Sequence, residues 1–303
     1  SEMCIRDSFA VVTAFRRGFT VSDIHQLSGI DPWFLAKIER ITGIYERLRT
    51  TRFTDPELYS ELKEAKESGF SDLQIASLLG TSPAKVRSVR KHLGIQPVVK
   101  QIDTLAAEYP ARTNYLYMTY GGNKDDIDFK ENAQVLVLGA GPIRIGSSVE
   151  FDWCTMNCVW ELKKKGYRAL VLNCNPETVS TDYDMSDKLY FEELSVERVL
   201  DIVDKENPLG VVVSVGGQTS NNLAFPLAKR GVSLFGTFGS DIDTAEDRAK
   251  FSRILDRFEI LQPPWSSFSN LDETEAFAEK VGYPVIIRPS YVLSGSAMKV
   301  ARD

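Results

Sequence analysis

Two patterns of apolar and polar residues divide the chain. From Phe9 to about Ala107, apolar residues recur at the three- and four-residue spacing of amphipathic helices. Beyond about residue 133, short runs rich in valine, isoleucine and leucine alternate with helical segments. Such alternation is typical of a parallel sheet covered by helices on both faces. The pattern predicts an α/β protein with a helical N-terminal domain.

Residues that typically cap helices indicate where the helices of the first region are expected to begin. Ser22 is the expected N-cap of the first one, and Asp-Pro pairs at 31–32 and 55–56 place a cap before a proline at the first helical position. The helix after Asp31 is expected to bury one apolar face, formed by Phe34, Ile38, Ile41, Ile44 and Leu48. Two shorter helices are expected at 72–79 and 83–93.

The second region begins after the polar stretch "GGNKDDIDFKEN" (121–132), a linker candidate. Strands are expected at 135–138, 169–173, 188–191, 210–215 and 233–235, with helices between them at 147–165, 196–206 and 221–229. After Ser240, helices at 245–258 and 271–281 and strands at 285–289 and 298–301 begin a further α/β unit.

The stretch "QVLVLGAGPIRIGSSVEFDW" (134–153) is a poor match to a dinucleotide fingerprint. Gly139 and Gly141 follow the strand correctly, but Arg144 stands where the third glycine should be, and that glycine comes only at Gly146. Asn173 ends the next strand where an acidic residue would bind ribose. A tight strand-to-helix turn that needs small residues explains the glycines equally well.

Three polar loops are expected to meet at one edge of the sheet. Residues 139–151, 173–184 and 216–222 follow parallel strands, and open α/β sheets bind ligands at the carboxyl ends of their strands. Taken alone, each of these segments has the glycine and polar residues that are found in ordinary surface loops. Together their glycine, hydroxyl, amide and acidic groups indicate a binding site.

Composition narrows the classes of function. The 303 residues contain no apolar run of about 20 residues and no signal segment, so no membrane partner is expected. The net charge of −6 gives no electrostatic reason to expect a nucleic-acid partner. The four cysteines are too few for a secreted disulfide framework, which favours a cytoplasmic protein. Residues 1–8 resemble a translated sequencing adaptor, and the chain stops inside an expected strand, so a fragment is expected.

Longer motifs carry a resemblance to a known family. "GPIRIGSSVEFDWC", "NCNPETVSTDYDMSDKLYFEELSVERVLDIV", "GGQT", "AEDRAKFSRILD" and "GYPVIIRPSYVLSG" are similar, in order and spacing, to the large subunit of carbamoyl-phosphate synthetase. The resemblance runs from about Phe9 to Asp303. It implies a helical oligomerisation domain at 9–120, the 121–132 linker, a parallel-sheet pre-ATP-grasp domain at 133–239 and the truncated start of an ATP-grasp domain at 240–303.

The resemblance also implies an activity. The parent enzyme would make carbamoyl phosphate from bicarbonate, glutamine-derived ammonia and two ATP, with a glutaminase small subunit or fused glutaminase domain as partner and self-association through the helical domain. Because the helical region comes first and the loop reads "RPSYVLSG", this part resembles the half that phosphorylates carbamate.

Four residues are the candidate ATP ligands. Arg288 is the expected catalytic residue and phosphate ligand, since a guanidinium presents a planar fork to phosphate oxygens. The resemblance adds Arg248, Ser294 and Gly295 as ATP-binding residues, although either arginine could instead be an exposed surface charge. The family commonly has a second glycine where this chain has Ser294. The Mg²⁺ ligands are expected beyond Asp303, so the isolated chain is expected not to turn over ATP.

Two other interpretations compete. "FSDLQIASLLGTSPAKVRSVRKHLGI" (70–95) is similar to a helix-turn-helix with a basic second helix, which would suit nucleic acid, and the whole chain could be an oligomerisation scaffold. Cys154 and Cys158 share a helical face, but zinc would need further ligands nearby, so small buried thiols are the simpler expectation.

Overall fold

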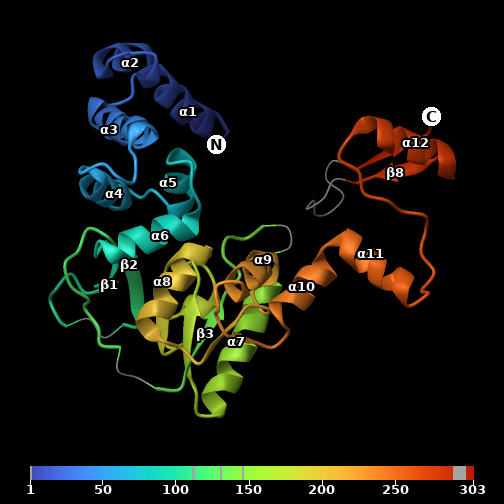
Figure 1. Ribbon diagram of the computed structural model, residues 1–303. Coiled ribbons are helices and arrows are strands. Elements are labelled where there is room, and N and C mark those ends of the chain that lie inside the picture. Colours follow the sequence, from blue (N-terminus) through green and yellow to red (C-terminus); the bar gives the residue numbers. More distant parts are fainter. Residues whose placement is uncertain (1, 111–112, 130–131, 145–146, 289–297) are drawn as a thin grey trace. The chain divides into compact units, whose positions relative to one another are not determined.

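The computed structural model describes residues 2–110, 113–129, 132–144, 147–288 and 298–303 (Figure 1). The chain forms two compact units. One comprises residues 1–99 with 118–125, and the other comprises residues 100–117 with 126–303. No helix among the described residues is long and apolar enough to cross a membrane.

The first unit is built from amphipathic helices. Its helices are α1 (Glu2–Arg16), α2 (Val21–Ser28), α3 (Pro32–Thr50), α4 (Leu58–Glu67), α5 (Asp72–Leu78) and α6 (Pro83–His92). The first of these begins inside the octapeptide that resembles an adaptor. Leu35 of α3 packs with α1 and α2 in one apolar cluster, whereas Ile44 and Leu48 pack with α4, α5 and α6 in another.

This division corrects the expected face of α3. Phe34 is 58% exposed and Ile41 is 43% exposed, while Leu35 is buried. The helix serves two clusters that lie on different sides of it, so a single stripe of apolar residues does not describe its burial.

The caps of two helices also differ from expectation. Thr20, not Ser22, caps α2: its hydroxyl accepts from the Asp23 backbone N–H at 3.2 Å, and the Asp23 carboxylate accepts from the Thr20 N–H at 2.9 Å. The hydrogen bonds from Thr20 lower the pKa of Asp23. Asp55 instead accepts from the Arg52 N–H, and α4 starts only at Leu58. The expected cap at Asp31 is confirmed by its bond with the Trp33 N–H at 2.8 Å.

A seven-stranded sheet forms the centre of the α/β region of the chain. Its order is β1-β2-β5-β4-β3-β6-β7. The strands are β1 (Val98–Gln101), β2 (Tyr115–Thr119), β3 (Gln134–Leu138), β4 (Arg168–Leu172), β5 (Lys188–Tyr190), β6 (Gly210–Val212) and β7 (Leu234–Phe235). The pairs from β2 through β7 are parallel. Every residue of β3 is buried, and because side chains alternate, both faces of the sheet are covered.

The strand order creates a switch point beside β3. The chain runs from β3 to β4 and β5 on one side, then returns to place β6 and β7 on the other. The connections carry α7 (Val149–Lys164), a short 3₁₀ helix (Val179–Thr181), α8 (Val196–Glu206) and α9 (Gly217–Ala228) (Figure 1). Loops that leave β3 and β6 therefore diverge at the place where open α/β sheets bind ligands.

The helix expected at 245–258 is two helices. These are α10 (Gly239–Glu246) and α11 (Arg248–Arg257), separated by Asp247 in an extended conformation. The Asp247 carboxylate accepts from the Lys250 N–H at 2.9 Å and starts the second helix. Then follow α12 (Leu271–Val281) and the antiparallel pair β8 (Val285–Ile287) and β9 (Lys299–Ala301).

Candidate functional site

The glycines after β3 are required by close packing at the carboxyl edge of the sheet. A Cβ on Gly216 would lie 2.3 Å from the Gly139 carbonyl oxygen, and a Cβ on Gly139 would lie 2.9 Å from the Asn173 side chain. Gly141 has φ +71°, a conformation that favours glycine. The loops that follow β3, β4 and β6 thus approach one another more closely than residues with a Cβ permit.

Asn173 ties two of these loops together. Its side chain is fully buried, and its amide oxygen accepts from the Gly141 N–H at 3.0 Å and the Asn175 N–H at 3.2 Å. Its amide nitrogen donates to the Ser180 hydroxyl at 3.2 Å and, more weakly, to the Thr178 hydroxyl at 3.4 Å. The residue that stands where a ribose-binding acid would be is therefore a structural link between the loops after β3 and β4.

A second bridge joins the loop after β6. Arg144 donates from Nη2 to the Thr219 hydroxyl at 2.8 Å, and Thr219 donates in turn to the Ser147 hydroxyl at 3.3 Å. Ser147 closes its own loop by donating to the Ala140 carbonyl. Thr219 lies in the first turn of α9, so this chain of hydroxyls connects the first loop to the start of α9. The stretch 216–222, expected as a loop, is helical from Gly217 onward, because α9 begins there. The predicted convergence of the three segments at this edge is confirmed.

Charge at this edge comes from a few carboxylates and Arg144. Asp152 of α7 is buried, and both its carboxylate oxygens accept from the Ser180 N–H at 3.3 Å. Glu150 accepts from the Ser148 hydroxyl, and this hydrogen bond lowers the pKa of Glu150. Partial burial raises the pKa of the Cys174 thiol, with a smaller contribution in the same direction from Glu193. The edge can orient a polar ligand through hydroxyl, amide and backbone groups.

Three family models match the chain in succession. Residues 6–94 match the oligomerisation domain of the carbamoyl-phosphate synthetase large chain, residues 131–244 match the carbamoyl phosphate synthase preATP-grasp domain, and residues 247–303 match the ATP binding domain of its large chain. All three are parts of one enzyme's large chain and occur without overlap. The chain belongs to the carbamoyl phosphate synthase large-chain family.

Full-length relatives agree with the family assignment. The carbamoyl phosphate synthase large chain of Hyperthermus butylicus is 52% identical over 95% of this chain and 27% of its own length. The mitochondrial carbamoyl-phosphate synthase [ammonia] of Mus musculus is 51% identical over 96% of this chain and 19% of its own length. The multifunctional protein URA2 of Saccharomyces cerevisiae is 50% identical over 96% of this chain and 13% of its own length. The chain thus spans about a quarter, or less, of the length of these relatives.

The likeness to solved structures is distant. N5-carboxyaminoimidazole ribonucleotide synthetase from Thermus thermophilus shares 16% identity, with a TM-score of 0.39 over 56% of this chain and 41% of that one.

The candidate ATP ligands lie in the region that matches the family's ATP-binding domain. Arg248 is exposed as the first residue of α11, and Arg288 is exposed directly after β8. Ser294 and Gly295 fall outside the described residues. The roles of these four residues therefore stay predictions. No group of three or more His, Cys, Asp or Glu side chains suited to a metal ion occurs in the described part of the chain.

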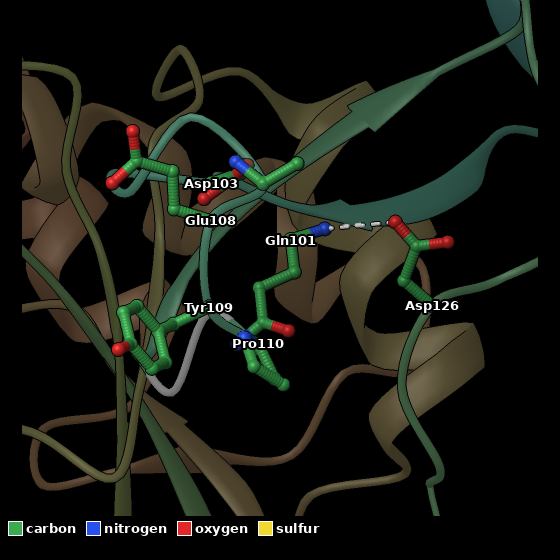
Figure 2. A pocket seen from close by; sticks show the side chains of 7 residues that line it. Gln101, Asp103, Glu108, Tyr109, Pro110 and Asp126 are labelled. Atoms are coloured by element: carbon green, nitrogen blue, oxygen red, sulfur yellow. Dashed lines mark hydrogen bonds between the residues drawn. The ribbon is translucent and has the colours of Figure 1, made fainter.

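A separate open cavity of about 420 Å³ lies beside the loop between β1 and β2 (Figure 2). Its lining includes Asp103, Glu108 and Asp126. Asp103 accepts from two backbone N–H groups of its own loop, and Asp126 pairs with Lys100 at 2.8 Å. The negative charge of this cavity opposes phosphate, and two of its carboxylates are used to hold the loop.

The helix-turn-helix interpretation is not favoured by the geometry of α5 and α6. Arg90, one of the basic residues of the second helix, is fully buried, and its Nε donates to Asp72 Oδ1 at 2.9 Å. Lys66 Nζ lies 3.2 Å from the same oxygen, and both cations stack on the ring of Tyr120. Arg90 therefore belongs to a buried ionic network and does not face a nucleic-acid backbone.

Sequence reasoning missed the roles of Asn173, Ser147 and Thr219. The comparison with a dinucleotide fingerprint treats Asn173 only as the wrong residue for binding ribose. Its position at a strand end, followed by hydroxyl residues at Thr178 and Ser180, is a signal in the sequence for a loop that bonds to an amide. The contacts of Ser147 and Thr219 depend on the strand order, which the sequence alone did not provide.

Proposed function

We propose that this chain is part of a carbamoyl-phosphate synthase that makes carbamoyl phosphate from bicarbonate, glutamine-derived ammonia and two ATP. The observation that carries the proposal is the convergence of three polar loops at the switch point of the sheet, directly before a region that matches an ATP-binding domain. Relatives named as carbamoyl phosphate synthases support it at about half identity.

The chain belongs, in this proposal, to the half that phosphorylates carbamate. Its helical region precedes the α/β region, as the resemblance implies, with domains at 9–120, 133–239 and 240–303. Transfer of a phosphoryl group needs positioned cations and donors around charged oxygens. Arg288 would be the principal phosphate ligand and catalytic residue. Arg248, Ser294 and Gly295 would complete the contacts to ATP from this chain.

Magnesium would be held by residues outside this chain. The described residues contain no cluster of three or more acidic, histidine or cysteine side chains suited to the ion. The isolated chain is accordingly proposed to be inactive in ATP turnover. A phosphate-release assay with bicarbonate, ammonia and ATP tests this, and robust turnover by the 303-residue chain would contradict it.

The proposed partners follow from the same family assignment. A glutaminase subunit or fused glutaminase domain would supply ammonia, and the multifunctional relative is compatible with a fused arrangement. Self-association would use the region that matches an oligomerisation domain. A cytoplasmic location is proposed, although the mouse relative is named as mitochondrial.

Arg288→Ala in a complete large chain carrying this segment tests the proposed site. Phosphorylation of ADP by carbamoyl phosphate, the reverse of carbamate phosphorylation, is expected to fall about 100-fold, because a bidentate donor to the transferring group is lost. Bicarbonate-dependent ATP hydrolysis, which reports the other half, is expected to stay near the wild-type rate.

Two variants make the result specific. Arg288→Lys keeps the charge without the planar fork and is expected to be intermediate. Arg257→Ala removes an exposed arginine from the last turn of α11 and serves as the control. An equal loss in both reactions, or no loss in either, would exclude Arg288 as a ligand of the carbamate-phosphorylating site.

A further inference from the structure

Glu246 stands at the junction between the two α/β regions. The match to the preATP-grasp domain ends at residue 244, and the match to the ATP-binding domain begins at 247. Glu246 is the last residue of α10, and Arg248 is the first residue of α11. The conformation of this short junction therefore sets the direction in which the ATP-binding region departs.

Two amides in the first two turns of α9, the helix that follows β6, hold the Glu246 carboxylate. Gln218 donates from Nε2 to Glu246 Oε2, and Asn221 donates from Nδ2 to Glu246 Oε1 at 3.4 Å. Gln218 also donates to Asn222 Oδ1 at 2.9 Å, which fixes the orientation of its amide. The amide oxygen of Asn221 is buried without a partner among the described residues, so the contact of its nitrogen with Glu246 is its principal polar interaction. We call Gln218, Asn221 and Glu246 the junction clasp.

The other end of α10 is fixed independently. A Cβ on Gly239 would lie 2.9 Å from the Ala224 carbonyl oxygen and 2.9 Å from Ala228 Cβ, so α10 starts in tight contact with α9. α10 lies along α9 (Figure 1). With its start held by packing and its end held by the clasp, α10 has little freedom to turn relative to α9.

Asp247 connects α10 to α11 and fixes how α11 begins. Its carboxylate caps α11 by accepting from the Lys250 N–H at 2.9 Å, and its carbonyl accepts from the Phe251 N–H at 2.8 Å. Lys250 also pairs with Asp243 of α10. Any movement of Glu246 therefore displaces the cap on which the first turn of α11, including Arg248, is built.

We propose that Glu246 is a positioning residue that couples the start of α9, at the candidate site, to the first turn of α11. It acts through its neighbours: it fixes the direction of Arg248 according to the position of Gln218 and Asn221, so a ligand that moves the start of α9 also changes ATP binding. This role in ATP binding rests on the proposed function, whereas the mechanical coupling itself does not.

Hydrogen exchange of the 303-residue chain tests the coupling without any need for enzymatic activity. Glu246→Ala is expected to speed exchange of the backbone amides of 247–251 about fivefold to tenfold, as the loss of exposed hydrogen bonds to a charged group predicts. Amides of β3 and β4, which belong to the same compact unit as residues 247–251, provide an internal reference for the stability of that unit. Asp241→Asn, on the same helix but outside the clasp, is the matched control and is expected to leave exchange at 247–251 unchanged.

A reversed pair distinguishes the clasp from a general effect of losing Glu246. Gln218→Glu alone places two carboxylates against each other and is expected to speed exchange at 247–251. Gln218→Glu combined with Glu246→Gln restores one donor and one acceptor in the opposite order, and is expected to bring exchange back to within about twofold of the original chain.

The outcomes separate the coupling from the proposed function. Unchanged exchange at 247–251 in Glu246→Ala, or failure of the reversed pair to restore protection, overturns the clasp. In the complete large chain, Glu246→Ala is expected to raise KM for ATP in carbamate phosphorylation about fivefold with a smaller change in kcat, and the reversed pair is expected to recover it. A loss of kcat alone overturns the positioning of Arg248, even where exchange confirms the coupling.

Discussion

At the carboxyl edge of the sheet most buried polar side chains are neutral, whereas at the amino edge they form an ion pair. The carboxyl edge uses Asn173, Ser147 and Thr219, with Asp152 as the buried carboxylate. At the amino edge, Lys188 Nζ lies 2.9 Å from Glu206 Oε2. The two edges belong to the same strands and share one core, so the difference is one of chemistry and not of scaffold.

The ion pair at the amino edge is surrounded by further contacts. Tyr190 donates its hydroxyl to Glu206, and Gln134 donates to the Glu206 backbone carbonyl at 3.0 Å. The ring of Phe129, from the segment expected as a linker, lies 5.5 Å from Lys188 Nζ. Because both charges are removed from water, each depends on the other, and loss of one partner leaves an uncompensated buried charge. The amino edge is therefore rigid in the sense that neither charge can change its partner cheaply.

The carboxyl edge has the opposite property. Hydroxyl and amide groups can exchange one partner for another at a modest cost, since a neutral hydrogen bond contributes only about 0.5–1.5 kcal/mol net. A ligand that enters this edge can replace some of these contacts. The comparison teaches that one end of the sheet is held by a buried ion pair, whereas the other end, at which three segments meet, is held mostly by neutral hydrogen bonds that can rearrange.

Glu206→Ala is the strongest test of the rigid end. The variant leaves Lys188 buried without its carboxylate, and breaking a buried pair on one side costs about 3–5 kcal/mol. The free energy of unfolding, measured by urea denaturation followed by tryptophan fluorescence, is expected to fall by that amount. Lys188→Met combined with Glu206→Gln removes both charges and keeps an acceptor for Tyr190, so it is expected to recover most of the loss.

The cost of the single variant is the decisive part of that experiment. If Glu206→Ala costs less than about 1 kcal/mol, the pair is no more important than an exposed one, and the contrast between the two edges fails.

Asn173→Ala tests the adaptable end and is expected to have the second largest effect. The variant leaves the Gly141 and Asn175 N–H groups without their acceptor, which is expected to lower the free energy of unfolding by about 2–3 kcal/mol. Asn173→Asp keeps the acceptor and is expected to cost less. Hydrogen exchange should rise at Gly141 and Asn175 in the alanine variant, while Lys188, Tyr190 and their strand keep their protection. Equal loss of protection at both edges would contradict their independence.

The sequence predicted the carboxyl edge better than the amino edge for a physical reason. Buried strands are recognisable as apolar runs, and parallel strands bring their carboxyl ends together whatever the detailed contacts are. The pairing of Lys188 with Glu206 depends instead on the length of α8 and on the order of strands β5, β4 and β3. Neither residue differs in the sequence from an ordinary exposed charge.

The errors at helix ends have a different, local origin. Asp247 interrupts an apparently continuous helical segment because its carboxylate caps α11, and Thr20 replaces Ser22 because Asp23 completes a reciprocal pair of hydrogen bonds. A side-chain cap contributes only about 1 kcal/mol. The spacing of apolar residues does not register such caps, so the pattern alone misplaces these helix ends.

The smallest expected effect concerns Cys174, which reports directly on the carboxyl edge. Burial raises the pKa of its thiol, so at pH 7.5 less of it is thiolate than in an exposed cysteine. Cys154 is exposed and is not the buried thiol expected from the sequence. Alkylation by iodoacetamide is therefore expected to be slower at Cys174 than at Cys154. The alkylation rate should rise with pH to a midpoint above the ordinary value of about 8.5.

Peptide mass spectrometry after quenched alkylation measures the alkylation rates of Cys174 and Cys154 in one sample. The pH is varied from about 6.5 to 10, on either side of the ordinary thiol pKa of about 8.5. Asn173→Ala opens the neighbouring loop and is expected to lower the Cys174 midpoint toward that of an exposed thiol, because desolvation is the largest cause of the shift. Glu206→Ala, at the opposite edge, is expected to leave the midpoint unchanged under folding conditions. A shift of the same size in both variants would mean that the two edges respond as one unit, and the separation of rigid and adaptable ends would then be wrong.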